Sequence, residues 1–153
     1  MSVKRKAALV ACSNPLQPGR REIIDLLCRT LERERLSVEV SPYLFDPEGY
    51  KLEKEKADVL NLFFADPDME FIFDVSGGDL ANSVLPYLDY ETIGRSRAAF
   101  FGYSDVTTVL NAIKTVISTV FNAVKSVTSS IWNGIKTAIS SVMDAIRSKV
   151  SSV

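Results

Sequence analysis

Residues 100–121 read FFGYSDVTTVLNAIKTVISTVF, and two different patterns meet within them. The first half has the apolar composition of a buried strand, and it runs into a serine at a tight turn. The second half opens a long stretch in which apolar residues recur at helical spacing. The sequence therefore predicts a strand–turn–helix junction at Ser104, followed by a long helix of different character.

Strand and helix patterns alternate along the chain before this junction. Short apolar runs typical of strands occupy residues 7–12, 36–40, 70–74 and 98–103. Helical spacing occupies residues 20–35, with Ile23, Ile24, Leu27 and Leu31 on one face, and residues 53–65, while residues 79–94 hold a short helix that Pro86 starts or bends. This alternation predicts an α/β fold with a small parallel sheet of flavodoxin- or Rossmann-like type, in which residues 7–12 and 98–103 are buried strands.

Charge divides the chain into two segments. The 153 residues carry a formal net charge of −1, which gives no indication of a nucleic-acid partner. Residues 1–110 hold 13 basic and 18 acidic residues, a balance of −5, whereas residues 111–153 hold five basic residues and one acid, a balance of +4. We therefore expect two parts of different origin, an α/β domain over residues 1–110 and a helical segment over residues 111–153.

The two cysteines indicate a reducing environment. Cys12 and Cys28 have no metal-ligand spacing, and the sequence contains no histidine. We expect a cytoplasmic chain with two core thiols, no metal ion and no cofactor. The apolar run at residues 7–10 is too short for a signal peptide. No apolar run reaches the roughly 18 residues of a membrane span.

Two loops that follow predicted strands carry suggestive chemistry. The first contains Gly77 and Gly78, whose missing Cβ atoms would let a substrate approach their backbone N–H groups. The second contains Ser104, placed as in a nucleophile elbow that exposes a serine hydroxyl and aims backbone amides at a developing oxyanion. The alternative is structural, because serine and aspartate are ordinary helix N-caps and paired glycines are common in loops.

Three blocks of sequence carry a family resemblance. The blocks ALVACSNP (8–15), FADPDMEFIFDVSGGDLANSVLPYLDYETI (64–93) and FFGYSDVTTVLNAI (100–113) together resemble the LD-carboxypeptidases, serine peptidases that include murein tetrapeptide carboxypeptidases and microcin immunity proteins. The resemblance covers about residues 6–113. It implies hydrolysis of L,D-peptide bonds in murein peptides, with Ser104 as the nucleophile. It also implies an oxyanion hole formed by the amide of Asp105 and an amide of the Gly77-Gly78 loop.

This sequence departs from the family pattern in two respects. Many relatives have an arginine before the glycine pair, where this chain has Ser76. The family's catalytic base is a histidine, supported by a glutamate in a separate C-terminal domain, and the sequence contains no histidine. A serine hydroxyl is a poor nucleophile without an adjacent base, and Lys114 lies about 15 Å along the following helix. We therefore expect a truncated nucleophile domain without appreciable carboxypeptidase activity.

The segment from Asn111 onward repeats every eleven residues. The units are NAIKTVISTVF, NAVKSVTSSIW, NGIKTAISSVM and DAIRSKVSSV, and they form one apolar stripe on a helix. We expect one helix over residues 105–150, or two helices broken near Asn133-Gly134, rather than a strand-forming or disordered tail. This segment resembles the helical repeats of phage tail tape-measure proteins, which suggests an in-frame fusion.

The apolar stripe also predicts a partner. A lone helix in water gains little from helix propensity, so the stripe must be covered. We expect self-association through residues 113–150, in preference to docking on the α/β domain or binding to a membrane surface. The alternative to a hydrolase is therefore a non-catalytic assembly protein that acts through this helix.

Overall fold

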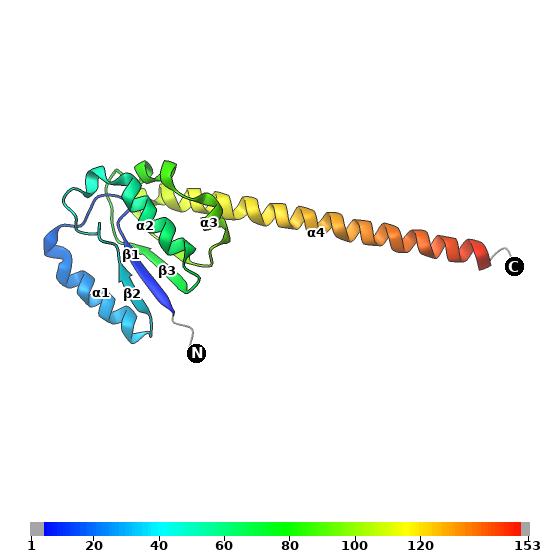
Figure 1. The fold of residues 1–153 in the computed structure, drawn as a ribbon, viewed down its shortest axis with the longest axis horizontal. Helices are drawn as coiled ribbons and strands as arrows, with labels where there is room; N and C mark the ends of the chain where they lie inside the picture. The colour runs from blue at the N-terminus through cyan, green and yellow to red at the C-terminus, as the bar shows by residue number, and fades with distance from the viewer. Residues whose placement is uncertain (1–4, 151–153) are drawn as a thin grey trace. The chain divides into compact units, whose positions relative to one another are not determined.

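The computed structural model describes residues 5–150, without the side chains of residues 120, 138–139 and 142–150 on the last helix. It confirms the predicted α/β class (Figure 1). The strands are β1 (Lys6–Val10), β2 (Ser37–Val40), β3 (Met69–Asp74) and β4 (Ala99–Phe101). The α-helices are α1 (Arg21–Arg33), α2 (Glu53–Ala65), α3 (Tyr90–Arg95) and α4 (Thr107–Val150). Short 3-10 helices occupy η1 (Pro18–Arg20), η2 (Gly49–Lys51), η3 (Ala81–Tyr87) and η4 (Ser104–Val106).

The four strands form one parallel sheet in the order β2-β1-β3-β4. β1 lies inside the sheet, with Leu9 opposite Val40 on one side and Phe73 on the other. Since both neighbours of β1 are strands and helices cover both of its faces, its residues Ala7–Val10 are almost fully buried. The apolar run predicted at residues 7–12 is confirmed as a buried parallel strand.

Alternate residues of β1 belong to two apolar cores. Ala8 and Val10 pack on one face with residues of α2, such as Leu60, while Leu9 packs on the other face with Ile24 of α1. Burying one aliphatic side chain of this size contributes about 1.5–3 kcal/mol. These two layers hold the carboxyl ends of the strands together, which is where the candidate site lies.

Three local predictions need correction. β4 is not a buried strand, because it lies at the sheet edge and the side chain of Phe101 is 47% exposed. Ile23 is 55% exposed and does not share the buried position of Ile24. Pro86 does not start the helix near residue 90, because it lies within η3; α3 instead begins after Asp89, whose side chain accepts the backbone N–H groups of Glu91 and Thr92.

The last helix, α4, is continuous from Thr107 through Gly134 to Val150. The prediction of one helix is confirmed, although the helix is preceded by the 3-10 turn η4 and starts at Thr107. The structure separates into two compact units after Val116. Val109 and Ile113 of the first unit are buried, whereas Phe121 and Trp132 of the second are 68% and 58% exposed. No helix in the described range 5–150 is long and apolar enough to cross a membrane.

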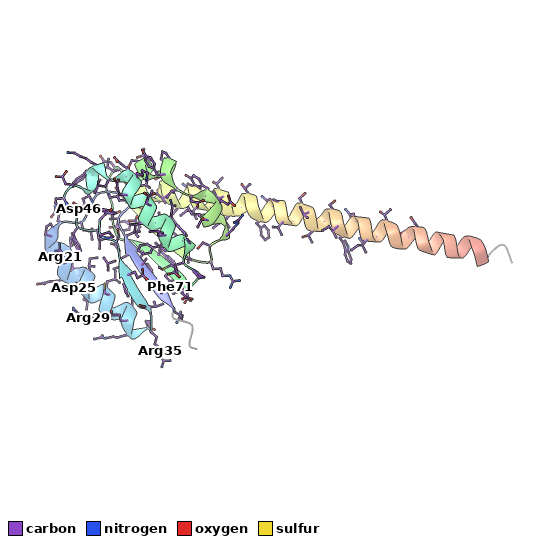
Figure 2. The ribbon with its side chains drawn as sticks, in the orientation of Figure 1. Arg21, Asp25, Arg29, Arg35, Asp46 and Phe71 are labelled. Carbon is purple, nitrogen blue, oxygen red and sulfur yellow. The ribbon has the colours of Figure 1, made fainter. Side chains whose placement is uncertain are left out.

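Charged side chains surround the apolar layers of the first unit. Figure 2 shows Arg21, Asp25 and Arg29 spaced along α1. The guanidinium of Arg21 lies over the ring of Phe45, 4.5 Å from its centroid. At the amino end of β1, the ammonium of Lys6 donates to Asp66 at 2.7 Å and forms an ion pair with Glu39 at 2.9 Å. These pairs connect β1 to the neighbouring strand β2, through Glu39, and to the loop after α2, through Asp66.

Candidate active site

Ser104 begins η4, with two residues between it and the end of β4 at Phe101, and has a left-handed backbone, with a φ of 56°. Holding a non-glycine residue in such a conformation costs on the order of 1–3 kcal/mol. The other non-glycine residue with positive φ in the described range is Arg35, which ends α1. There Leu36 N–H donates to Leu31 and Arg35 N–H to Glu32, the usual pattern of a left-handed helix cap. Ser104 instead begins a helix, and a positive φ at a strand-to-helix turn is the conformation expected of a nucleophile elbow.

The glycine pair after β3 lies beside this serine. A Cβ atom placed on Gly77 would be 3.9 Å from the Cβ of Ser104 and 3.6 Å from the ring of Tyr103. Gly78 has a φ of 148°, and a Cβ atom there would meet the side chain of Asn14 at 2.4 Å. The loop is therefore built for glycine at position 78, and the absence of a side chain at Gly77 leaves its backbone accessible from the side of Ser104.

The sequence analysis selected Asp105 only for its backbone amide, but its side-chain carboxylate also makes hydrogen bonds. Its Oδ2 atom accepts hydrogen bonds from the hydroxyl of Ser13 at 2.6 Å and from the N–H of Ala81 at 3.0 Å. The Ser13 hydroxyl in turn accepts the N–H of Leu80 at 3.3 Å. The carboxylate of Asp105 thus ties the elbow to the loop after β1 and to η3.

Ser76 faces the interior of the first unit. It is fully buried, and its hydroxyl donates to Asp74 at 2.5 Å and accepts the N–H of Ser13 at 3.0 Å. The carboxylate of Asp74 also accepts the N–H groups of Cys12 and Ser76, each at 2.9 Å. Sequence reasoning considered Ser76 only as a substituted substrate contact. Asp74, two residues earlier, was the available sequence signal for a buried turn at Ser76, because aspartate side chains in Asx turns bond the backbone two residues on.

Lys56 was missed by the sequence analysis. This residue of α2 is only 6% exposed, and its ammonium donates to the carbonyl of Ser13. Burial lowers the pKa of Lys56. The helical pattern of residues 53–65 gave no signal for this, because lysine is one of the residue types least often buried.

Cys12 is not a competing nucleophile. It is 2% exposed, and burial, followed by the nearby charge of Asp74, raises the pKa of its thiol. A buried thiol with a raised pKa stays protonated and unreactive near neutral pH. Ser104 is therefore the candidate nucleophile of this edge of the sheet. Within residues 5–150, no hydrogen bond joins its hydroxyl to a side chain that could act as a base.

A serine with positive φ between a parallel strand and a helix, beside a diglycine loop, is the arrangement typical of a serine-nucleophile site in α/β folds. The model of the LD-carboxypeptidase N-terminal domain matches residues 7–122. The chain belongs to the LD-carboxypeptidase family. The match extends past residue 113, where the resemblance was expected to end, into the first eleven-residue unit.

Relatives of known name agree with this assignment. The microcin C7 self-immunity protein MccF of Escherichia coli is 42% identical over 60 residues, which are 39% of this chain and 17% of that protein. A carboxypeptidase-like protein of Vibrio cholerae is 42% identical over 60 residues, 39% of this chain and 18% of that protein. The solved structure of an MccF-like protein from Bacillus anthracis superposes with a TM-score of 0.66 at 27% identity, and covers 76% of this chain and 36% of that one.

The chain thus spans about a third of the solved relative and less than a fifth of the curated ones in aligned sequence. Solved structures of MccF include complexes with aspartyl sulfamoyl adenosine and with glutamyl sulfamoyl guanosine. These ligands are bound by MccF.

Proposed function

We propose that the first unit of this chain provides the nucleophile half of a serine carboxypeptidase site. The observation that carries the proposal is the left-handed Ser104 against Gly77 at the carboxyl edge of the sheet. In this role the Ser104 hydroxyl attacks the scissile carbonyl. The amides of Asp105 and of the Gly77-Gly78 loop donate to the oxyanion that develops.

The proposed substrate is a small peptide-like molecule with a free carboxyl end, of the murein-peptide class. The complexes of MccF with aminoacyl sulfamoyl nucleosides support a small peptide-like ligand in this family. The reaction would be acyl transfer to Ser104 with release of the C-terminal residue, followed by hydrolysis of the ester. The free thiols of Cys12 and Cys28 fit a reducing, cytoplasmic setting.

The 153 residues lack the base that this chemistry requires. They contain no histidine, and the buried Lys56 is engaged with the carbonyl of Ser13. Removing a triad partner typically lowers the rate about 10⁴-fold or more. We infer that these residues alone do not turn over substrate and that a histidine-bearing domain must complete the site.

The experiment is a tetrapeptide cleavage assay on two proteins. One is the 153-residue chain, and the other is the same chain fused to the C-terminal domain of an MccF-type relative. Cleavage by the fusion and none by the chain supports the proposal. Cleavage by the chain alone that disappears in Ser104→Ala would show that another group acts as the base.

A second candidate function rests on the exposed stripe of α4. In the second unit, Ile117, Phe121, Val124, Val127, Ile131, Trp132 and Ile135 are all 45% exposed or more. We propose that α4 self-associates through residues 117–150, a shorter stretch than the predicted 113–150 because Ile113 is buried in the first unit. We also propose that the part of residues 111–153 beyond the family match, which ends at residue 122, is a tape-measure-like segment joined to the peptidase domain. Size-exclusion chromatography with light scattering tests this. A monomer at high concentration with the emission of a buried Trp132 would refute self-association.

A further inference from the structure

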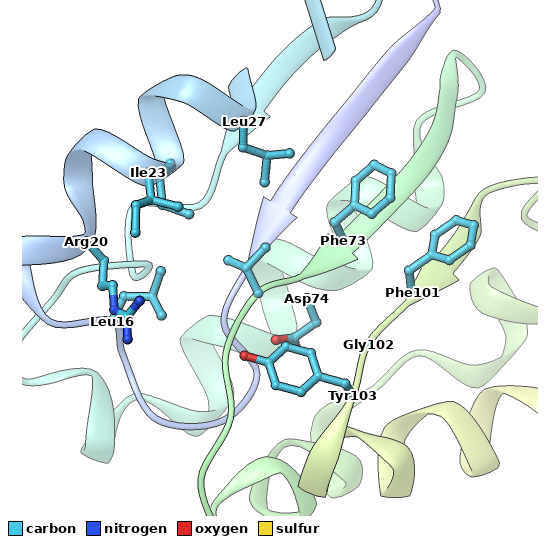
Figure 3. A pocket seen from close by; sticks show the side chains of 11 residues that line it. Leu16, Arg20, Ile23, Leu27, Phe73, Asp74, Phe101, Gly102 and Tyr103 are labelled. Carbon is cyan, nitrogen blue, oxygen red and sulfur yellow. The ribbon is translucent and has the colours of Figure 1, made fainter. Parts of the chain in front are cut away.

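An open apolar cleft lies in the first unit, between α1 and the outer half of the sheet. Its volume is about 550 Å³, and it is bordered by α1, the loop before it and the ends of β3 and β4 (Figure 3). Pockets that hold small molecules commonly have volumes of about 300–1,000 Å³ and are lined mainly by apolar side chains with a few polar groups. The cleft has the size and lining of such a site.

The position of the cleft in the fold is also that of a ligand site. From β1 the chain passes to β2 on one side, and later to β3 on the other, so strand order reverses between β1 and β3. In open parallel sheets, ligands bind outside the carboxyl ends of the strands at such a point. The loop after β1 contributes Leu16 to the cleft, and the end of β3 contributes Asp74 and Val75.

One wall of the cleft is aromatic. The rings of Phe73 and Phe101 are stacked, with centroids 5.2 Å apart and an interplanar angle of 21°. Figure 3 shows Leu27 pointing from α1 toward these rings across the cleft. Within the described residues, both sides of the cleft are partly exposed to solvent. Phe101 of the aromatic wall is 47% exposed, and Ile23 on the α1 side is 55% exposed. A flat apolar group of a ligand, placed in the cleft, would cover the Phe73–Phe101 wall and the α1 side at the same time.

The polar lining is unbalanced in charge. Arg20 lines the cleft, and no ion pair or side-chain hydrogen bond joins its guanidinium to another residue of the described range. The acid in the lining is Asp74, and both of its carboxylate oxygens already accept hydrogen bonds from Cys12 and Ser76. A guanidinium without an internal partner favours an anionic group, because its planar fork matches a carboxylate.

We propose that this cleft binds an organic carboxylate with a planar apolar body, with the carboxylate at Arg20 and the body between α1 and the Phe73–Phe101 wall. The inference goes beyond the proposed function, because Ser104 does not line the cleft and no hydrolysis is required for binding. It assigns a binding site to the space between α1 and the sheet, which borders the nucleophile loop through Gly102 and Tyr103.

The test uses a pair of probes that differ in charge, indole-3-acetate and the neutral indole-3-ethanol, in calorimetric titrations of the full chain. The acid should bind about tenfold more tightly than the alcohol, the ratio that one charge-assisted contact of about 1.4 kcal/mol provides. Arg20→Gln should remove this preference. Arg29→Gln, on α1 but outside the cleft, should leave it intact.

A second variant keeps the proposal testable if Arg20→Gln does not fold. Ile23→Glu places a negative charge at an exposed cleft position, so it should weaken binding of the acid more than binding of the alcohol while the fold persists. The proposal is overturned if neither probe saturates, or if Arg20→Gln and Arg29→Gln keep the same preference for the acid. It is also overturned if the chain associates through this face and the acid does not displace the second copy.

Discussion

The hydroxyl of Ser13 donates to the carboxylate of Asp105 at 2.6 Å, although 92 positions separate the two residues in sequence. Ser13 lies after the first strand, and Asp105 directly follows the candidate nucleophile. Because the same carboxylate oxygen accepts the N–H of Ala81, three segments meet at one atom. The conformation of the elbow therefore depends on residues from both ends of the α/β unit.

The coupling of Ser13 and Asp105 can be measured by a double-mutant cycle. Asp105→Ala leaves the Ala81 N–H and the Ser13 hydroxyl without their acceptor, so it should lower the free energy of unfolding by about 1–3 kcal/mol. Ser13→Ala and Asp105→Ala should be non-additive by more than about 0.5 kcal/mol. The exposed Asp79→Ala serves as the control and should change little. Additive effects in urea denaturation would contradict a direct bond.

Backbone strain at Ser104 predicts an unusual stabilising substitution. Ser104→Gly should raise the free energy of unfolding by about 1 kcal/mol, because glycine adopts positive φ without a steric penalty, whereas Ser104→Ala should not raise it. Arg35→Gly, at the left-handed end of α1, should give a similar gain and serves as the positive control. Thermal unfolding would measure both. Equal stability of the glycine and alanine variants at position 104 would show that the serine is unstrained.

The two glycines before the elbow should respond differently to alanine. At Gly78 a methyl group meets Asn14 within 2.4–2.7 Å and the φ of 148° remains unfavourable, so Gly78→Ala should cost about 1–3 kcal/mol. At Gly77 the nearest atoms would lie at 3.6–3.9 Å, an ordinary contact distance, so Gly77→Ala should be nearly neutral for stability. Denaturation midpoints of the two variants would decide this. A larger loss at Gly77 than at Gly78 would contradict the described loop.

The pair formed by Lys6 and Asp66 predicts part of the stability in acid. The hydrogen bond from Lys6 lowers the pKa of Asp66 in the folded chain, and the unfolded chain therefore binds a proton at Asp66 at higher pH. This contribution is present above the unfolded value near 4 and is lost as the pH falls through the lower folded value. Asp66→Asn should cost up to about 1 kcal/mol at pH 7 and flatten the acid limb of the stability curve. An acid limb of unchanged slope in Asp66→Asn would contradict this contribution.

Much of the fold follows from local patterns in the sequence. The helix predicted over residues 53–65 is α2 with the same bounds, because its helical spacing ends at the Asp66-Pro67 pair. The proximity of Ser104 and Gly77 could be predicted because parallel strands place their carboxyl ends at one edge. In both cases, local chemistry and the rules of parallel sheets were sufficient.

Other features depend on which elements become neighbours. Phe101 is as apolar as a core residue, but it is exposed because β4 lies at the sheet edge. Lys56 is buried because α2 brings it under the loop after β1, where it binds a carbonyl. Nothing in residue type or spacing distinguishes Phe101 from a buried phenylalanine or Lys56 from a solvated lysine. Only the assembled sheet and its loops define them.

The proposed nucleophile is Ser104, acting in a site that a histidine-bearing domain completes. The most direct measurement is intact-mass spectrometry of the chain fused to a histidine-bearing C-terminal domain, quenched during turnover of a murein tetrapeptide. We expect an acyl adduct of the substrate, without its C-terminal residue, that maps to the peptide containing Ser104 and is absent in Ser104→Ala. Turnover that continues unchanged in Ser104→Ala, with no adduct on that peptide, would contradict the claim.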